Sequence, residues 1–205
     1  VDLNCLLLHL EQTIAEAYQQ KENNDAAKKY NLSAQKRKAA IQQYCWNEEE
    51  GFYFDYDFLA AQQKQSFTLA AAFPLLCRIA SDIQAKRVAA IIKGKFLMPG
   101  GVVTTLITTG QQWDAPNGWA PLQWITIKGL KNYYHTDLAK DIAAKWIQLN
   151  KDVFQRTGKL MEKYNVVDTT TEAGGGEYPG QDGFGWTNGV LISLIKKYET
   201  TPDLT

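Results

Sequence analysis

The sequence predicts an all-α fold, and two features lead to this prediction. Apolar residues recur with the 3.6-residue period of a helix through most of the 205 residues. Long polar, aromatic and glycine-rich segments separate these helical stretches, and strands do not alternate with helices as they do in α/β proteins. We therefore expect helices joined by long loops, in one domain or a large part of one.

Four helices are predicted in the first half of the chain, from apolar spacing, caps and proline. Aromatic and acidic residues alternate around residues 52–58, which predicts a short hairpin or an extended loop with Gly51 at its turn. Pro74 kinks or divides the third helix, and Ser81 with Gln84 forms a capping box at the start of the fourth. The four helices are expected at about residues 3–21, 25–44, 68–80 and 81–96. The first helix carries an apolar face made of Leu3, Leu6, Leu7, Leu10, Ile14 and Ala17.

Three further helices are predicted at about residues 119–134, 137–154 and 185–197. The helix at 137–154 has the clearest apolar stripe, which consists of Leu138, Ile142, Trp146, Leu149 and Val153. If the helices alternate in direction around a ring, every second loop lies on the same rim. The loops at 99–118 and 155–184 would then share one face, with the 47–58 segment displaced to a rim.

Composition and charge argue against several classes of protein. Lysine plus arginine equals aspartate plus glutamate, 22 each, so no charge excess indicates a nucleic-acid or membrane partner. The chain has no run of 18 apolar residues and no basic segment at its start, so we expect neither a membrane span nor a signal peptide. Cys5, Cys45 and Cys77 are far apart among apolar neighbours, so we expect core residues rather than disulfides or metal ligands.

The segment QQWDAPNGWAP, residues 111–121, combines Trp113 and Trp119 with Gln112 and Asp114. Aromatic rings cover the apolar faces of sugars, whereas carboxylates and amides bind sugar hydroxyls. The segment lacks the cations that a phosphate site would need. Two interpretations fit this composition: a polyol-binding site, and a tryptophan-rich turn in which Asp114 accepts hydrogen bonds from backbone amides.

Two more segments carry carboxylates in unusual surroundings. Residues 172–189, EAGGGEYPGQDGFGWTNG, surround Glu177 and Asp182 with glycines, which would let the backbone approach a ligand; an irregular connector is the alternative. Neither nucleotide-binding glycine pattern is present. Glu162, in GKLMEKYNVVD, is an isolated carboxylate beside apolar residues and a candidate functional group, whereas a surface glutamate paired with lysine is the alternative.

Together these motifs resemble those of the trehalase family. QWDAPNGWAP is similar to a trehalase signature, and GGGEYPGQDGFGWTNGV is similar to the family's glycine-rich segment. PGGVVTT and MEKYNV stand in the family's order and spacing, and VDLN resembles the stretch that follows the other signature. The resemblance covers essentially the whole chain. It implies an (α/α)6 toroid, with residues 1–205 as the C-terminal part of a single catalytic domain. It also implies cofactor-free hydrolysis of α,α-trehalose to two glucoses with inversion of the anomeric centre.

The resemblance also implies roles for single residues. Glu162 matches the general base, Glu177 matches a substrate-binding glutamate, and Trp113 and Asp114 belong to a signature and are expected to bind substrate. The family's general acid is an aspartate upstream of VDLN, and the arginines that grip the substrate are also upstream; neither has a match here. We therefore expect the partner to be the N-terminal part of the same enzyme, in the same chain or as a cleaved companion. A non-catalytic sugar-binding or scaffold module and another α/α-toroid glucosidase are the alternatives.

Overall fold

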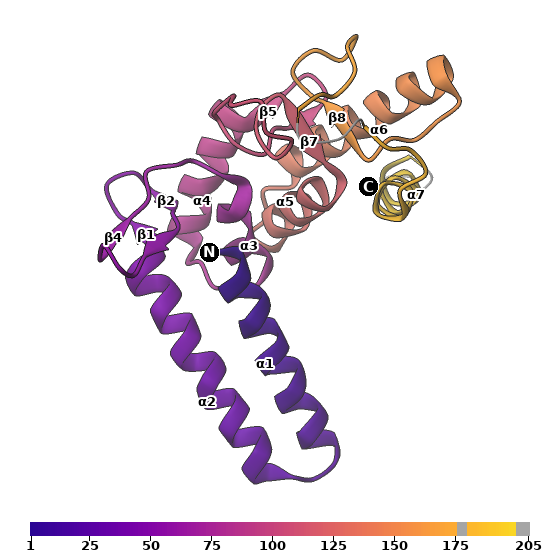
Figure 1. The fold of residues 1–205 in the computed structure, drawn as a ribbon. Coiled ribbons are helices and arrows are strands. Elements are labelled where there is room, and N and C mark those ends of the chain that lie inside the picture. The colour runs from indigo at the N-terminus through magenta and orange to yellow at the C-terminus, as the bar shows by residue number, and fades with distance from the viewer. Residues whose placement is uncertain (176–179, 200–205) are drawn as a thin grey trace.

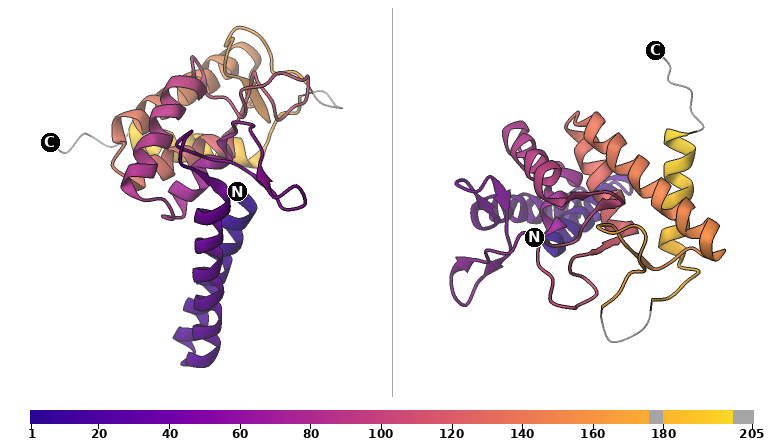
Figure 2. Two further views of the ribbon diagram at one scale, coloured as in Figure 1. Left: turned by 90° about the vertical axis from the view of Figure 1, so that its left-hand side faces the viewer. Right: turned by 90° about the horizontal axis from the view of Figure 1, so that it is seen from above.

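The structure, a computed structural model, describes residues 1–175 and 180–199. These residues are mostly helical, as predicted. The helices α1 and α2 form an antiparallel hairpin that projects from the remaining helices (Figure 1; Figure 2, left). No helix in the described part is long and apolar enough to cross a membrane. The α-helices are α1 (Asp2–Gln20), α2 (Asn24–Ala40), α3 (Phe73–Leu76), α4 (Asp82–Ile91), α5 (Ala120–Asn132), α6 (Thr136–Thr157) and α7 (Gly185–Tyr198).

Local sequence signals explain where several helices begin and end. The predicted capping box is present, because Ser81 accepts from the backbone of Gln84 while the Gln84 side chain accepts from the backbone of Ser81. Pro74 occupies the first turn of α3, which follows a short 3-10 turn at Leu69–Ala72, so the predicted third helix is divided. Single π-helical turns, Ile41–Cys45 and Ile92–Phe96, continue α2 and α4 to about the predicted helix ends at residues 44 and 96.

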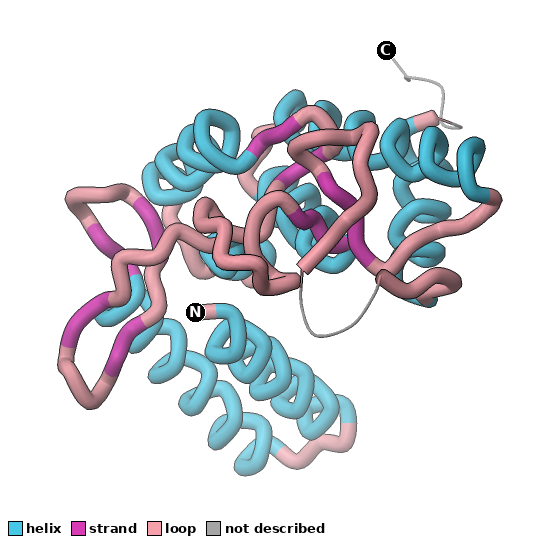
Figure 3. The backbone as a smooth tube through the Cα atoms, turned by 45° about the horizontal axis from the view of Figure 1, so that its top comes forward, coloured by secondary structure: helices cyan, strands magenta, loops and turns pink. Residues whose placement is uncertain are grey.

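Short antiparallel strand pairs lie in the loops between the helices (Figure 3). The predicted hairpin is present as β1 (Trp46–Asn47) and β2 (Phe52–Tyr53), and Gly51 adopts a positive φ of 67° at its turn. The other pairs were not predicted. They join β3 (Tyr56–Asp57) to β4 (Gln62–Gln63), β5 (Leu97–Met98) to β6 (Gly101–Val102), and β7 (Asn117–Trp119) to β8 (Lys163–Asn165).

The core is one cluster of buried side chains to which α1 to α7 and the loops between them contribute. The predicted stripe of α6 is confirmed: Ile142, Trp146, Leu149 and Val153 are buried, and Leu138 packs against them. Burial of such large side chains contributes roughly 1.5–3 kcal/mol each to folding. The predicted apolar face of α1 is wrong, because Leu3, Leu6 and Leu10 are exposed. The helix buries a different set of residues, Cys5, Leu8 and Ala15.

The two long loops meet on one face of the helices, as the sequence predicts. The backbone amide of Val166 donates to the carbonyl of Pro116 at 3.0 Å, and that of Gly100 donates to the carbonyl of Val166 at 2.9 Å. The hairpins β1–β2 and β3–β4 lie to one side of this region (Figure 3). Segments that are 50 residues or more apart in the sequence therefore build one surface.

Candidate active site

The ladder between β7 and β8 brings the tryptophan-rich loop next to the strand that follows Glu162. Trp119 pairs with Lys163 and Gly118 with Tyr164. A Cβ atom at Gly118 would lie 2.4 Å from Cγ1 of Val166, so the close approach of the two strands requires glycine there. Glu162, one residue before β8, is thereby fixed beside the end of the loop.

Glu162 is buried, with only 3% of its surface exposed. Its backbone amide donates to the carbonyl of Gln181 at 2.8 Å, and its carbonyl accepts from Nε1 of Trp186 at 3.3 Å. Oε2 of its carboxylate lies 4.0 Å from Nζ of Lys163. The alternative interpretation of Glu162 as a surface glutamate is therefore wrong, because the charged pair is enclosed by the protein.

Three tryptophan rings form the aromatic part of the site. Trp113 stacks in parallel on buried Trp119, with the ring centroids 3.8 Å apart, and Trp186 meets Trp119 edge-on at 5.8 Å. Trp113 and Trp186 are 43% and 37% exposed. Sequence reasoning assigned no role to Trp186, although it stands in the matched segment GFGWTNG. The exposed parts of both rings can contact the apolar face of a sugar.

Asp114 is buried and hydrogen-bonded within its own loop. Oδ1 accepts from the hydroxyl of Thr105 at 3.1 Å, and Oδ2 accepts from the hydroxyl of Thr109. The interpretation of this segment as a tryptophan-rich turn predicted that Asp114 accepts hydrogen bonds from backbone amides. Asp114 does hold the loop closed, but its donors are threonine hydroxyls. Binding of substrate by Asp114 remains a prediction.

The glycine-rich segment crosses the tryptophan-rich loop at close range. The carbonyl of Gly174 accepts from Nδ2 of Asn117 at 2.7 Å. Gly175 has a φ of +81°, and a Cβ atom there would lie 2.7 Å from the carbonyl oxygen of Gly110. Both features require glycine at position 175. Glu177, the predicted substrate-binding residue, lies outside the described residues.

Lys163 is a buried cation at the centre of these segments, and sequence reasoning gave it no role of its own. Its Nζ lies 3.2 Å from Oε1 of Gln112 and 3.5 Å from the carbonyl oxygen of Gly175. The same atom lies 5.6 Å from the centroid of the Trp119 ring. An isolated charge is costly to bury, and these contacts offset that cost.

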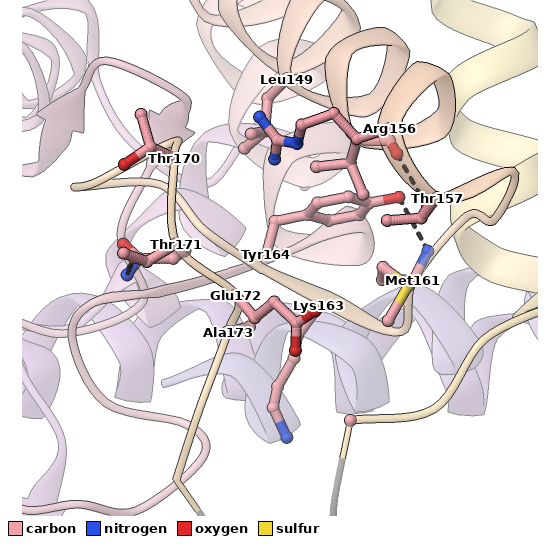
Figure 4. Close-up of a pocket in the computed structure, with 13 residues that line it drawn as sticks. Leu149, Arg156, Thr157, Met161, Lys163, Tyr164, Thr170, Thr171, Glu172 and Ala173 are labelled. Carbon is pink, nitrogen blue, oxygen red and sulfur yellow. Dashed lines mark hydrogen bonds between the residues drawn. The ribbon is translucent and has the colours of Figure 1, made fainter.

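A cavity of about 250 Å³ lies between the C-terminal half of α6 and the segment that follows β8 (Figure 4). Arg156, Tyr164 and Glu172 line it, and the side chain of Lys163 points away from Arg156 and Tyr164. Burial raises the pKa of Tyr164 to about 12, so its phenol is neutral at physiological pH. Its hydroxyl accepts from the backbone amide of Met161 at 2.8 Å, which supports the residue preceding Glu162.

Within residues 1–175 and 180–199, no group of three or more His, Cys, Asp or Glu side chains is arranged to hold a metal ion. The predicted core cysteines are free; Cys5 and Cys45 are buried, and Cys77 is partly buried.

Sequence comparison matches residues 1–199 to the trehalase family. The chain is 45% identical over 195 residues to the periplasmic trehalase of Salmonella newport (strain SL254), and it is similarly related to that of Salmonella agona (strain SL483). The alignment covers 95% of this chain and 34% of each relative. The chain thus spans about a third of the length of these curated relatives.

Structural comparison agrees with this family match in fold. Neutral trehalase Nth1 from Saccharomyces cerevisiae superposes with a TM-score of 0.80 at 28% identity, over 96% of this chain and 37% of that one. A GH63 mannosylglycerate hydrolase from Thermus thermophilus superposes with a TM-score of 0.73 at 18% identity, over 96% and 45% of the two chains, and shows likeness of fold alone. These structures are (α/α)6 toroids, and this chain aligns to part of one. From the family match and these relatives, we conclude that the chain belongs to the trehalase family.

Proposed function

We propose that this chain supplies the general base of an inverting hydrolase that converts α,α-trehalose to two glucoses. One observation carries the proposal: the structure buries Glu162, in the motif MEKYNV, where the tryptophan-rich loop meets the glycine-rich segment. Membership of the trehalase family supports the reaction class. The acid partner and the rest of the substrate site would belong to the part of the enzyme that this chain does not span.

In this mechanism the carboxylate of Glu162 takes a proton from water, and the oxygen of that water attacks the anomeric carbon from the face opposite the leaving glucose. An aspartate elsewhere in the enzyme gives its proton to the glycosidic oxygen as the bond to carbon breaks. Inverting enzymes hold the two carboxyl groups about 6.5–9.5 Å apart, which leaves room for the water. Glu162 suits the role of base because its backbone is fixed on both sides by Gln181 and Trp186.

The remaining predicted site residues would bind the sugar. The exposed parts of Trp113 and Trp186 would cover an apolar sugar face, and Glu177 would accept hydrogen bonds from hydroxyls. Asp114 would act mainly by closing the loop that presents Trp113, given its two threonine donors.

The partner that we propose is the N-terminal part of the same enzyme, in the same chain or as a cleaved companion, with residues 1–205 as the C-terminal part of one toroid. A toroid is a closed double ring of helices, and this chain aligns to 37% of the yeast trehalase structure. The exposed leucines of α1, Leu3, Leu6 and Leu10, would pack against that part.

The test is Glu162→Gln in the complete enzyme. Loss of the base should lower trehalose turnover by about 10²–10⁴-fold while leaving trehalose affinity within about tenfold, since the amide keeps the shape of the side chain. Azide should restore part of the turnover and yield a glucosyl azide of inverted configuration. Glu16→Gln, an exposed change on α1, is the matched control and should turn over normally. Retention of half or more of the turnover by Glu162→Gln would remove this residue from the role of base.

Substrate choice separates the proposal from the alternatives. The complete enzyme should hydrolyse trehalose in strong preference to maltose. A preference for maltose would favour another toroid glucosidase, and sugar binding without turnover would favour a binding module.

A further inference from the structure

Lys163 stands at the point where three separated segments meet, and the proposed mechanism assigns it no task. It lies on β8, directly after Glu162, and its side chain is almost completely buried. Burying a lysine costs several kcal/mol unless its ammonium is well paired. Lys163 therefore provides, through its charge, an interaction that an apolar side chain at that place would lack.

The ammonium bridges segments that neither share a strand nor adjoin in sequence. From the tryptophan-rich loop, Oε1 of Gln112 lies 3.2 Å from Nζ, and from the glycine-rich segment the carbonyl oxygen of Gly175 lies 3.5 Å away. The backbone carbonyl of Gln112 in turn accepts from Nδ2 of Asn117 and from Nε1 of Trp119, each at 3.1 Å. A displacement of Lys163 would thus reach the stacked tryptophans through Gln112.

The same ammonium lies opposite the proposed base, with Nζ 4.0 Å from Oε2 of Glu162. Among the described residues on the segment paired with Glu162, Asp182 forms an exposed ion pair with Lys159 at 2.5 Å. From α7, Trp186 and Thr187, which carry no charge, donate hydrogen bonds to the backbone carbonyls of Glu162 and Met161. Lys163 is thus a buried charge that faces the Glu162 carboxylate.

We propose that Lys163 is a positioning residue: its buried ammonium ties Gln112 and Gly175 to the strand that carries Glu162, and it holds the Glu162 carboxylate in place. This inference rests on the proposed role of Glu162 as the base. A general base must lie within hydrogen-bond reach of the water that it deprotonates, so its efficiency depends on where its carboxylate is held.

The test is Lys163→Met in the complete enzyme, because methionine keeps an unbranched apolar stem and removes the charge. We expect kcat to fall by roughly 10- to 100-fold, the order of loss that a small misplacement of a catalytic group causes. KM should change little, since a misplaced base slows the chemical step and leaves the binding of trehalose in place. A residue with a purely structural role would lower the Tm without this selective loss of kcat.

Lys145→Met is the matched control. Lys145 lies on α6, is partly exposed and pairs with Asp141 at 3.3 Å, so the same chemical change there should leave kcat and KM unaltered. An unchanged kcat in Lys163→Met, together with an inactive Glu162→Gln enzyme, would overturn the inference and leave the proposed base standing. An active Glu162→Gln enzyme would overturn both.

Gln112→Met provides a second test that leaves the buried charge in place and holds even if Lys163→Met does not fold. It removes the contact between Gln112 and the ammonium, so kcat should fall with little change in KM. In a double-mutant cycle the effects of the two substitutions on kcat should be less than additive, because both remove the same contact. A folded Gln112→Met enzyme with wild-type kcat would contradict the proposed role of the contact between Gln112 and Lys163.

Discussion

Trp113, Trp119 and Trp186 give the candidate site a ready-made aromatic surface. Trp119 is buried and held by the hydrogen bond from its Nε1 to the carbonyl of Gln112, so it can support the ring of Trp113 that stacks on it. Aromatic surfaces add contact area and need polar neighbours to fix the orientation of a sugar. We assign that task to Glu177, because it matches the family's substrate-binding glutamate.

Glu177→Ala should weaken ground-state binding as well as turnover, since its proposed role is to hold hydroxyl groups instead of moving a proton. Hydrogen bonds to a charged group contribute roughly 1.5–3 kcal/mol each, which corresponds to a loss of affinity of about 10- to 150-fold. Calorimetry of the complete enzyme with a non-hydrolysable trehalose mimic is the measurement. An unchanged dissociation constant in a folded variant would contradict the binding role.

Some of these side chains could be found from the sequence and others could not. Glu162 and Trp113 stand in segments whose letters match the family, so both were predicted. The burial of Glu162 has no local signal, because the residues that enclose it, Gln181 and Trp186, come from later in the chain. Lys163 was missed for the same reason, since a lysine next to a glutamate is normally an exposed pair.

The β7–β8 ladder is the element that joins the site. Its strands are three residues long and lie more than 40 residues apart. Such short strands contain no alternation of polar and apolar residues that would predict their pairing. The helices, in contrast, were predictable from local features: the α6 stripe has the helical period and Ser81 caps α4 through its own neighbours. The sequence therefore predicted the framework, while the contact between distant loops required the structure.

Gly118→Ala should destabilise the protein and disturb the site. The added Cβ would lie 2.4 Å from Cγ1 of Val166 and 3.0 Å from the carbonyl oxygen of Val102, so these groups or the strands must shift. Overpacking of this kind typically costs about 1–3 kcal/mol. Gly94→Ala is the control, because a Cβ there meets no atom within 4 Å. Thermal unfolding of the complete enzyme should show a lower Tm for Gly118→Ala alone, and equal Tm values for the two variants would contradict the packing argument.

At the scale of the whole molecule, α1 carries an apolar surface that the other described residues leave exposed to solvent. Leu3, Leu6 and Leu10 lie one helical turn apart on α1, in a hairpin that projects from the other helices (Figure 1). Exposed apolar stripes of this kind mark interfaces or aggregation sites. Because the chain aligns to about a third of its trehalase relatives, the proposed occupant is the remainder of the toroid.

Complementation tests the central claim most directly, namely that this chain carries the base of a trehalase whose remainder carries the acid. The 205-residue chain and the remaining part of the enzyme are produced separately and mixed, and the release of glucose from trehalose is measured. We predict no activity from either part alone, activity from the mixture with the wild-type chain, and almost none from the mixture with Glu162→Gln. Hydrolysis of trehalose by the 205-residue chain alone, or equal activity from both mixtures, would contradict the account.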